Sequence, residues 1–325
     1  MNYQRSAGVV LNRRRAHFDR RHPHKTVNRT LSRAGVVVSA IFFAVNSTAQ
    51  AHGFAGQRFF PATVLTDDPF VADEGSLPTI TSNPTAADGS QELDLGTDIA
   101  KRITSNLGFT LRTGWAHVQP VGAPATTSWA GLATGLQYQL FVNAPRESIG
   151  LVGLNTSWAG GLRDFTTLTP TFDFGKGLGE LPASLKFFRP LAVTGNLSFD
   201  FPTRAQSAGT PNPNNFNYAF AVEYSLPYLQ CCVKDVGLRH PFSQMIPLVE
   251  MAFSRPVSRN AGLGTTGTIQ PGVIWSAKNY QISAEAIIPA NGASGRGLGA
   301  LLQLHFYLDD LFPHSIGQPI LGKKS

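Results

Sequence analysis

Over most of this chain every second residue is apolar, and the residues in between are mostly small or polar. From residue 280 the apolar positions are Tyr280, Ile282, Ala284, Ala286 and Ile288, and the positions between them are Gln281, Ser283, Glu285 and Ile287. Successive side chains of a β-strand point to opposite faces, so a period of two predicts strands. No stretch carries the 3.6-residue apolar period of an amphipathic helix. The fold class that we expect is therefore all-β.

The strand pattern can be counted along the sequence. Eleven segments carry it directly, at 92–103, 108–118, 129–142, 148–158, 167–178, 190–202, 217–229, 244–255, 267–276, 279–289 and 297–308. The connectors between them are turn-forming, such as "NAPRES" and "NGASGRG". Single-chain bacterial barrels have an even number of strands. We therefore expect a twelfth strand at 76–82, which pairs with 297–308 and closes the sheet.

Two antiparallel architectures have strands in which apolar and polar residues alternate. A soluble sandwich or small barrel turns its apolar face inward, whereas an outer-membrane barrel turns it toward lipid and keeps a polar lumen. Charged residues make up 14% of the chain, against about 25% in ordinary soluble proteins, which favours the membrane. Aromatic residues lie near the predicted strand ends, where the girdles of a barrel belong: Trp115, Trp129, Trp158, Tyr218, Trp275, Tyr280 and Phe306. We predict a closed antiparallel up-and-down transmembrane β-barrel of about 12 strands, surrounded by the lipid of the cell outer membrane.

The first 51 residues have the pattern of a signal peptide. A basic stretch precedes the apolar run Ala34–Val45, and Ala49 and Ala51 form an A-x-A cleavage pattern. The run is shorter than the roughly 20 residues of a spanning helix. This leader holds nine of the 27 Lys and Arg and one of the 20 Asp and Glu, so 18 basic residues face 19 acidic ones in the remainder. The basic pI therefore comes from the leader and does not indicate nucleic-acid binding.

The pattern divides the chain into four parts. We predict a signal peptide at 1–51, an N-terminal segment at 52–75, the transmembrane barrel at 76–308 and a C-terminal tail at 309–325. The N-terminal segment "FFPATVLTDDPFVADE" mixes apolar with acidic residues. It either folds into the lumen as a plug or forms a periplasmic tail. We favour the plug, because Phe59, Phe60, Val64, Leu65 and Phe70 would otherwise be exposed to water.

The last predicted strand, "GLGALLQLHFYL", places glycine before alternating apolar and aromatic residues. Together with the signal peptide and the repeats of period two, it resembles the Gram-negative outer-membrane β-barrel proteins. In particular it is similar to a transporter-like group related to proteins of aromatic-compound (phenol) degradation clusters. The resemblance covers roughly residues 76–308. It implies insertion by the barrel assembly machinery and a function as a pore or transporter for small hydrophobic or aromatic ligands.

Charged side chains are also expected on the inward face of the strands. The candidates for lining the lumen are Asp98, Arg102, Arg112, Asp173, Asp200, Glu223, Glu250, Glu285 and His305. They could set the selectivity of an open lumen, or they could pair within a plugged one, since buried charges must be paired or wetted. The arginines lie on early strands and the glutamates on late ones, which would suit pairing across the barrel.

Other chemistry has little support in the sequence. No motif of a hydrolase, metalloprotease, P-loop or dinucleotide site is present, so we expect no catalytic residues, no cofactor and no metal site. An enzyme of the lipase or protease type remains an alternative, with His305 beside Ser283, and so does a structural or adhesive barrel without transport. The adjacent Cys231 and Cys232 are expected to be a reduced or mixed pair in a turn, because adjacent cysteines bond to each other only in a strained ring.

Overall fold

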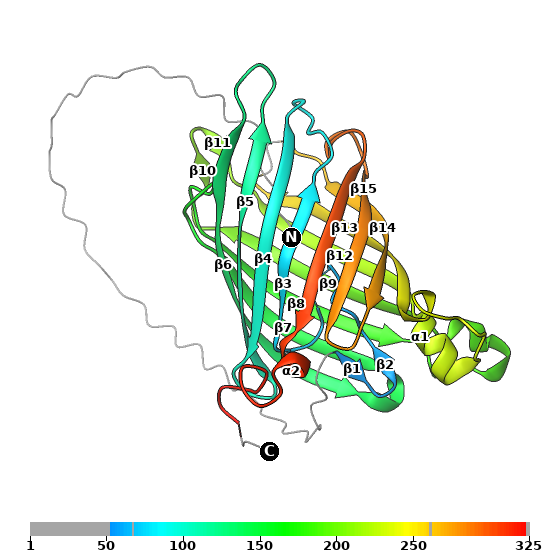
Figure 1. Ribbon diagram of the computed structural model, residues 1–325. Helices are drawn as coiled ribbons and strands as arrows, with labels where there is room; N and C mark the ends of the chain where they lie inside the picture. The colour runs from blue at the N-terminus through cyan, green and yellow to red at the C-terminus, as the bar shows by residue number, and fades with distance from the viewer. Residues whose placement is uncertain (1–52, 67, 260–261, 323–325) are drawn as a thin grey trace, which may run out of the picture.

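The computed structural model describes residues 53–66, 68–259 and 262–322, so the predicted signal peptide lies outside the described residues. Twelve antiparallel strands form a closed barrel (Figure 1). They are β3 (Glu74–Ser82), β4 (Gln91–Arg102), β5 (Leu107–Gln119), β6 (Thr126–Asn143), β7 (Ser148–Ser157), β8 (Thr167–Gly177), β9 (Leu191–Pro202), β12 (Asn214–Tyr224), β13 (Met245–Ser258), β14 (Thr266–Ser276), β15 (Tyr280–Pro289) and β16 (Gly299–Tyr307). Each strand pairs with its neighbours in sequence, and β3 pairs with β16, where Ile80 lies opposite Leu302. The predicted closure at twelve strands is confirmed.

The remaining elements are short. Two small hairpins are β1 (Phe54–Ala55) with β2 (Arg58–Phe59), and β10 (Gln206–Ser207) with β11 (Thr210–Pro211). The helical turns are η1 (Ala144–Arg146), η2 (Ala183–Phe188), α1 (Leu226–Tyr228), η3 (Leu229–Val233), η4 (Phe242–Gln244) and α2 (Leu308–Leu311). No helix within the described ranges is long and apolar enough to cross a lipid bilayer.

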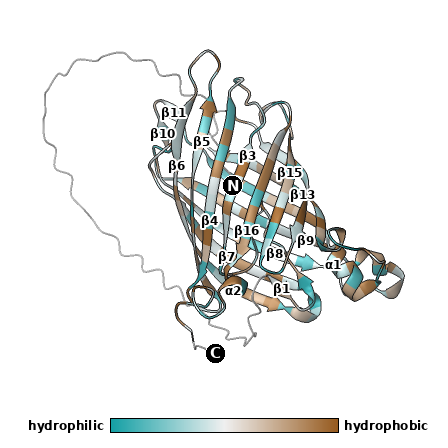
Figure 2. Cartoon of the chain, viewed as in Figure 1, coloured by the Kyte–Doolittle hydropathy of each residue, from teal (hydrophilic) through white to brown (hydrophobic). Residues whose placement is uncertain are grey.

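The outer surface of the barrel is apolar at every second strand position, as Figure 2 shows along the strands. Leu302 is 54% exposed and Leu95 48% exposed, whereas their sequence neighbours face inward. Trp115 lies opposite Trp129 toward one end of the barrel, and the rings of Trp275 and Tyr280 lie 5.7 Å apart toward the other. A closed barrel with an apolar outer band between two aromatic girdles is the architecture of outer-membrane proteins. The protein is therefore an outer-membrane β-barrel.

The two ends of the barrel differ in their connections. The turns 103–106, 144–147 and 277–279 are short and lie at the end that carries α1 and α2. Short turns are typical of the periplasmic side of such barrels, and we name this end the periplasmic end. The connectors 178–190 and 225–244 are long exceptions at the same end, and in Figure 1 α1 projects to the side of the barrel there.

One predicted face is wrong. A period of two along β6 predicts that Val142 faces outward with Leu136, Tyr138 and Leu140, but Val142 packs against a buried cluster inside the barrel. The pairing of β6 with β7 shifts between Gln139 and Phe141. A β-bulge of this kind inserts one residue and reverses the facing of the residues beyond it.

The prediction of a reduced or mixed cysteine pair is also wrong. Cys231 and Cys232 form a disulfide with an S–S distance of 2.01 Å. The two residues lie in η3, a single π-helical turn that follows α1 in the long periplasmic connector. A compartment that oxidises thiols is where disulfides persist, and the periplasmic side of an exported protein is such a compartment.

Candidate functional site

A segment of the chain before the first barrel strand lies inside the barrel. We call the described residues of this segment, 53–66 and 68–73, the plug. Its backbone accepts a hydrogen bond at Ala62 O from Gln281 Nε2 of β15 (2.5 Å), and Leu65 N donates to Glu250 Oε2 of β13 (2.6 Å). On the other side of the barrel Gln139 of β6 bonds Val71 N (3.1 Å) and Pro69 O (3.0 Å). The plug therefore spans the lumen and is bonded to strands on both sides.

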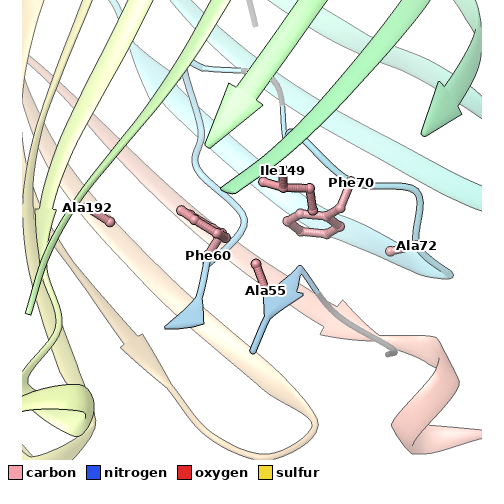
Figure 3. Close-up of a cluster of buried hydrophobic side chains, with 6 residues drawn as sticks. All are labelled: Ala55, Phe60, Phe70, Ala72, Ile149 and Ala192. Atoms are coloured by element: carbon pink, nitrogen blue, oxygen red, sulfur yellow. The ribbon is translucent and has the colours of Figure 1, made fainter. Parts of the chain in front are cut away.

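The plug also fills apolar recesses of the inner wall. Its side chains enter three clusters, shown for the first in Figure 3: Ala55, Phe60, Phe70 and Ala72 with Ile149 and Ala192; Val64 with Ile287 and Leu301; and Phe59 with Ile246, Leu248 and Ile274. Glycines on the wall leave room for it. A Cβ at Gly175 would lie 2.9 Å from the Phe60 ring, and one at Gly108 would lie 2.4 Å from Val71 Cγ1. The lumen wall is shaped to this segment.

One end of the plug is fixed by a buried arginine. The Arg58 guanidinium donates from Nε to Glu147 Oε2 (3.2 Å) and from Nη1 to Pro190 O (3.0 Å), and Nη2 bonds Arg189 O. It lies over the Tyr228 ring, 3.9 Å from the centroid, and Tyr228 Oη donates to Glu147 Oε1 (2.6 Å). We call Arg58, Glu147 and Tyr228 the Arg58 anchor. It joins the plug to three periplasmic connectors.

The tyrosine of this anchor gives it a dependence on pH. Burial, together with the hydrogen bond to Glu147, raises the pKa of Tyr228 to about 12 from its ordinary 10. The stabilisation is complete below pH 10, where the hydroxyl is protonated in the folded and the unfolded chain alike. It is lost between pH 10 and 12, where only the unfolded chain gives up the proton.

We therefore expect the unfolding midpoint in denaturant to fall between pH 10 and 12 more steeply for the wild-type protein than for a Tyr228→Phe variant. Tryptophan fluorescence in detergent micelles measures both curves. Parallel curves over this range would mean that Tyr228 does not couple the anchor to pH.

The other end of the plug is fixed where it enters the barrel sheet. Asp73 accepts from Lys101 Nζ (2.6 Å), Arg102 N (2.8 Å) and Arg102 Nε (2.7 Å). Its own carbonyl accepts from Leu308 N, at the start of α2 (2.8 Å). Arg102 also lies 3.6 Å from Asp309 in the C-terminal tail. We call Asp73, Lys101 and Arg102 the Asp73 anchor; it joins the plug, the end of β4 and the tail.

The nine charged candidates for lining the lumen do not form one site. Arg102 belongs to the periplasmic mouth, where it forms ion pairs with Asp73 and Asp309 rather than with acids of the late strands. Asp98 and Arg112 face each other on β4 and β5. Farther from the periplasmic end, two aspartates accept hydrogen bonds from neutral side chains. Asp173 accepts from Thr171 and Asn196. Asp200 accepts from Thr169 and Asn217. Glu223, Glu250 and Glu285 lie on β12, β13 and β15.

His305 borders a cavity of about 40 Å³ between the plug and the wall, which Asp98, Arg112 and Ser76 also line. Its Nδ1 lies 2.9 Å from Ser76 Oγ and its Nε2 lies 3.3 Å from Glu74 Oε2. Sequence analysis paired His305 with Ser283, but its serine neighbour is Ser76 on β3. A cavity of this size holds one or two water molecules, and the plug covers it.

Sequence analysis singled out Arg102 of the Asp73 anchor, as a lumen residue, but no residue of the Arg58 anchor. Arg58, Glu147 and Tyr228 are separated by 81 residues or more, and two of them lie in connectors where no alternation marks an inward position. The signal that was present is the charge of Arg58 and Asp73 at the two ends of an apolar segment. Charged residues of that kind need partners when the segment is buried.

No protein-family model matches the sequence, and no curated protein sequence matches it. The fold is similar to solved outer-membrane barrels. One is the KdgM porin, solved in complex with disordered oligogalacturonate, at 10% identity and a TM-score of 0.46, covering 71% of this chain and 98% of that one. Another is the NanC porin, at 7% identity and a TM-score of 0.48, covering 72% of this chain and 98% of that one. The β domain of the Bordetella autotransporter BrkA has 10% identity and 0.38, covering 73% and 99%. Likenesses this distant concern the fold alone.

Proposed function

We propose that the protein is a pore or transporter of the outer membrane, that the plug closes its lumen, and that its cargo is small hydrophobic or aromatic molecules. The observation that carries this proposal is the fit of Phe59, Phe60 and Phe70 into apolar recesses of the inner wall. A lumen that only conducted water and ions would have no need of apolar side chains on its inner face.

The recesses become a route when the plug moves. Ile149, Ile246, Ile274, Ile287 and Leu301 would then face the lumen without their plug partners. Exposed apolar surface is covered favourably by an apolar solute, at roughly 25 cal/mol per Å². A small aromatic molecule could therefore replace a phenylalanine ring of the plug. The resemblance to the transporter-like group of phenol-degradation clusters supports the same class of cargo.

A structural or adhesive barrel without transport is the second candidate. The observation that favours it is the pair of anchors, which fix both ends of the plug with buried, charge-assisted hydrogen bonds. A hydrolase is the third, and its support is the contact of His305 with Ser76 and Glu74. Ser76 is buried beneath the plug, so a substrate would need the plug to move first.

The test is uptake by Gram-negative host cells that produce the wild-type protein or an Arg58→Met variant, or that carry an empty vector. The probes are a hydrophobic aromatic dye that fluoresces on reaching membranes and a pentose of similar size. Loss of about 1.4 kcal/mol from the closed state would multiply the open population about tenfold, so we expect Arg58→Met to raise dye uptake by at least that factor.

The matched control is Arg204→Met, which removes an exposed arginine from the pair with Asp164. It should leave uptake at the wild-type level. Uptake in Arg58→Met cells equal to that of empty-vector cells would contradict the pore. A larger rise for the pentose than for the dye would contradict the cargo class.

A further inference from the structure

Two glutamates on the inner wall are buried and form no ion pair with a basic residue of the part of the chain that the structure describes. Glu250 of β13 is fully buried and Glu285 of β15 is 5% exposed. One oxygen of Glu250 accepts a hydrogen bond from Leu65 N of the plug, but its other oxygen has no hydrogen-bond partner. The two oxygens of Glu285 also have no hydrogen-bond partner. No Lys, Arg or His of the described residues forms a salt bridge with either glutamate.

The two glutamates lie on the strands that flank β14. Glu250 lies directly opposite Gln270 of β14, and Glu285 lies opposite Gly272 of the same strand. A Cβ at Gly272 would lie 2.3 Å from Glu285 Cγ, so the Glu285 side chain crosses over β14 in the direction of β13. Gly272 is the residue that permits the approach.

Neutral oxygens surround the same place. Gln270 donates its amide nitrogen to Thr268 (3.0 Å), while its carbonyl oxygen Oε1 has no partner. Ser283 Oγ, two positions from Glu285 on the inner face, and Thr66 Oγ1 of the plug are likewise buried without a partner. Gln270, Ser283 and Thr66 are each less than 4% exposed. Buried polar atoms without partners are rare in folded proteins, and a water molecule or an ion commonly supplies the missing partner.

We propose that this group of oxygens binds a hard divalent cation, with Ca²⁺ as the best match. Its ligands would be the carboxylates of Glu250 and Glu285 and the Gln270 carbonyl oxygen, with Ser283 and Thr66 beside them. Buried carboxylates need a compensating charge, and two of them balance a divalent ion. Calcium accepts carboxylate, amide and hydroxyl oxygens in flexible geometries. No group of three or more His, Cys, Asp or Glu that could hold a metal lies within the described ranges, so the neutral oxygens are essential to the site.

The site would also hold the part of the plug around Leu65. Glu250 uses one oxygen for Leu65 N and would use the other for the cation, so the ion would fix the wall strand to which the plug is bonded. This part of the inference rests on the proposed function, since it makes the cation a latch on the closed pore. The binding itself does not depend on transport.

The experiment measures Ca²⁺ binding by titration calorimetry and the thermal unfolding midpoint, on the full-length mature protein in detergent micelles. A hundredfold excess of free Ca²⁺ over its Kd should raise the midpoint by about 5 °C or more. The rise should disappear in Glu285→Gln, which keeps the side-chain volume and removes one charge. It should persist in Glu180→Gln, whose glutamate is exposed and pairs with Lys176. Circular dichroism verifies that each variant is folded.

Three outcomes would overturn the proposal. They are a wild-type protein with no heat of binding and no midpoint shift in Ca²⁺ or Mg²⁺, a shift that is equal in Glu285→Gln, and a midpoint that responds to acid but not to any cation, which would mean that the carboxyls hold protons. If Ca²⁺ raised the unfolding midpoint but Arg58→Met cells took up no more dye than empty-vector cells, the cation site would stand and the pore would be rejected. The reverse pair of results would reject the site alone.

Discussion

A Glu147→Ala variant is expected to lose about 3–5 kcal/mol of unfolding free energy, because removing one partner of a buried ion pair leaves the other uncompensated. Glu147 accepts from Arg58 Nε, from Tyr228 Oη and from Gly179 N, which lies 2.9 Å from its Oε2. All three donors would be left without this acceptor, and Arg58 is only 1% exposed. The measurement is denaturant titration in micelles, followed by tryptophan fluorescence.

The control for this variant is Glu180→Ala. Glu180 pairs with Lys176 at 2.9 Å, and both side chains are exposed to solvent. Exposed pairs contribute about 0–1 kcal/mol, so the control should unfold close to the wild-type midpoint. Equal losses in the two variants would show that the Arg58 anchor does not hold the plug in solution. A large loss for Glu147→Ala with unchanged dye uptake would show that the anchor stabilises the barrel without controlling access.

An Asp73→Asn variant is expected to lose about 3 kcal/mol of unfolding free energy. This is slightly less than the loss expected for Glu147→Ala, because Asp309 still lies near Arg102. The amide keeps the volume of the carboxylate but offers a single acceptor oxygen and no charge to Lys101 and Arg102. Asp73 is completely buried. The plug end, the end of β4 and the C-terminal tail should loosen together, because all three are bonded to this group.

Limited proteolysis separates a local loosening from a global one. We expect cleavage after Lys101 or Arg102 to appear in Asp73→Asn at protease levels that leave the wild-type protein intact. The control is Asp164→Asn, which removes a charge from an exposed pair with Arg204. Cleavage patterns that are identical in wild type and Asp73→Asn would contradict the assignment of this residue as an anchor.

Much of the wall could be predicted because the membrane barrel makes a local demand on the sequence. Lipid on one side and a lumen on the other require a change of residue type at every position, so Glu285 and His305 could be placed inward from their neighbours alone. Where a β-bulge interrupted the alternation, the predicted facing was wrong. The bulge after Gln139 reversed the face of Val142, and nothing in the adjacent residues marks the inserted position.

The candidate sites were much less predictable. The Arg58 anchor joins residues from the plug and from two connectors, and the proposed cation site joins β13, β14 and β15 through the gap at Gly272. Alternation says which way a residue faces but not what stands opposite it. Which of the inward carboxylates have neutral partners, as Asp200 does, and which have none, as Glu285 does, depends on strand register.

The sequence by itself determined the strand number, the closure of β3 on β16 and the inward or outward face of most strand residues. These follow from a period of two and from the fact that hydrocarbon offers no partner to an open strand edge. Only the tertiary structure decided what the plug touches, that Cys231 and Cys232 are bonded, and that the Glu285 side chain lies over Gly272 of β14, the strand between Glu285 and Glu250. Those contacts join residues far apart in the chain or in different strands, and their geometry is fixed by register and bulges that no local pattern encodes.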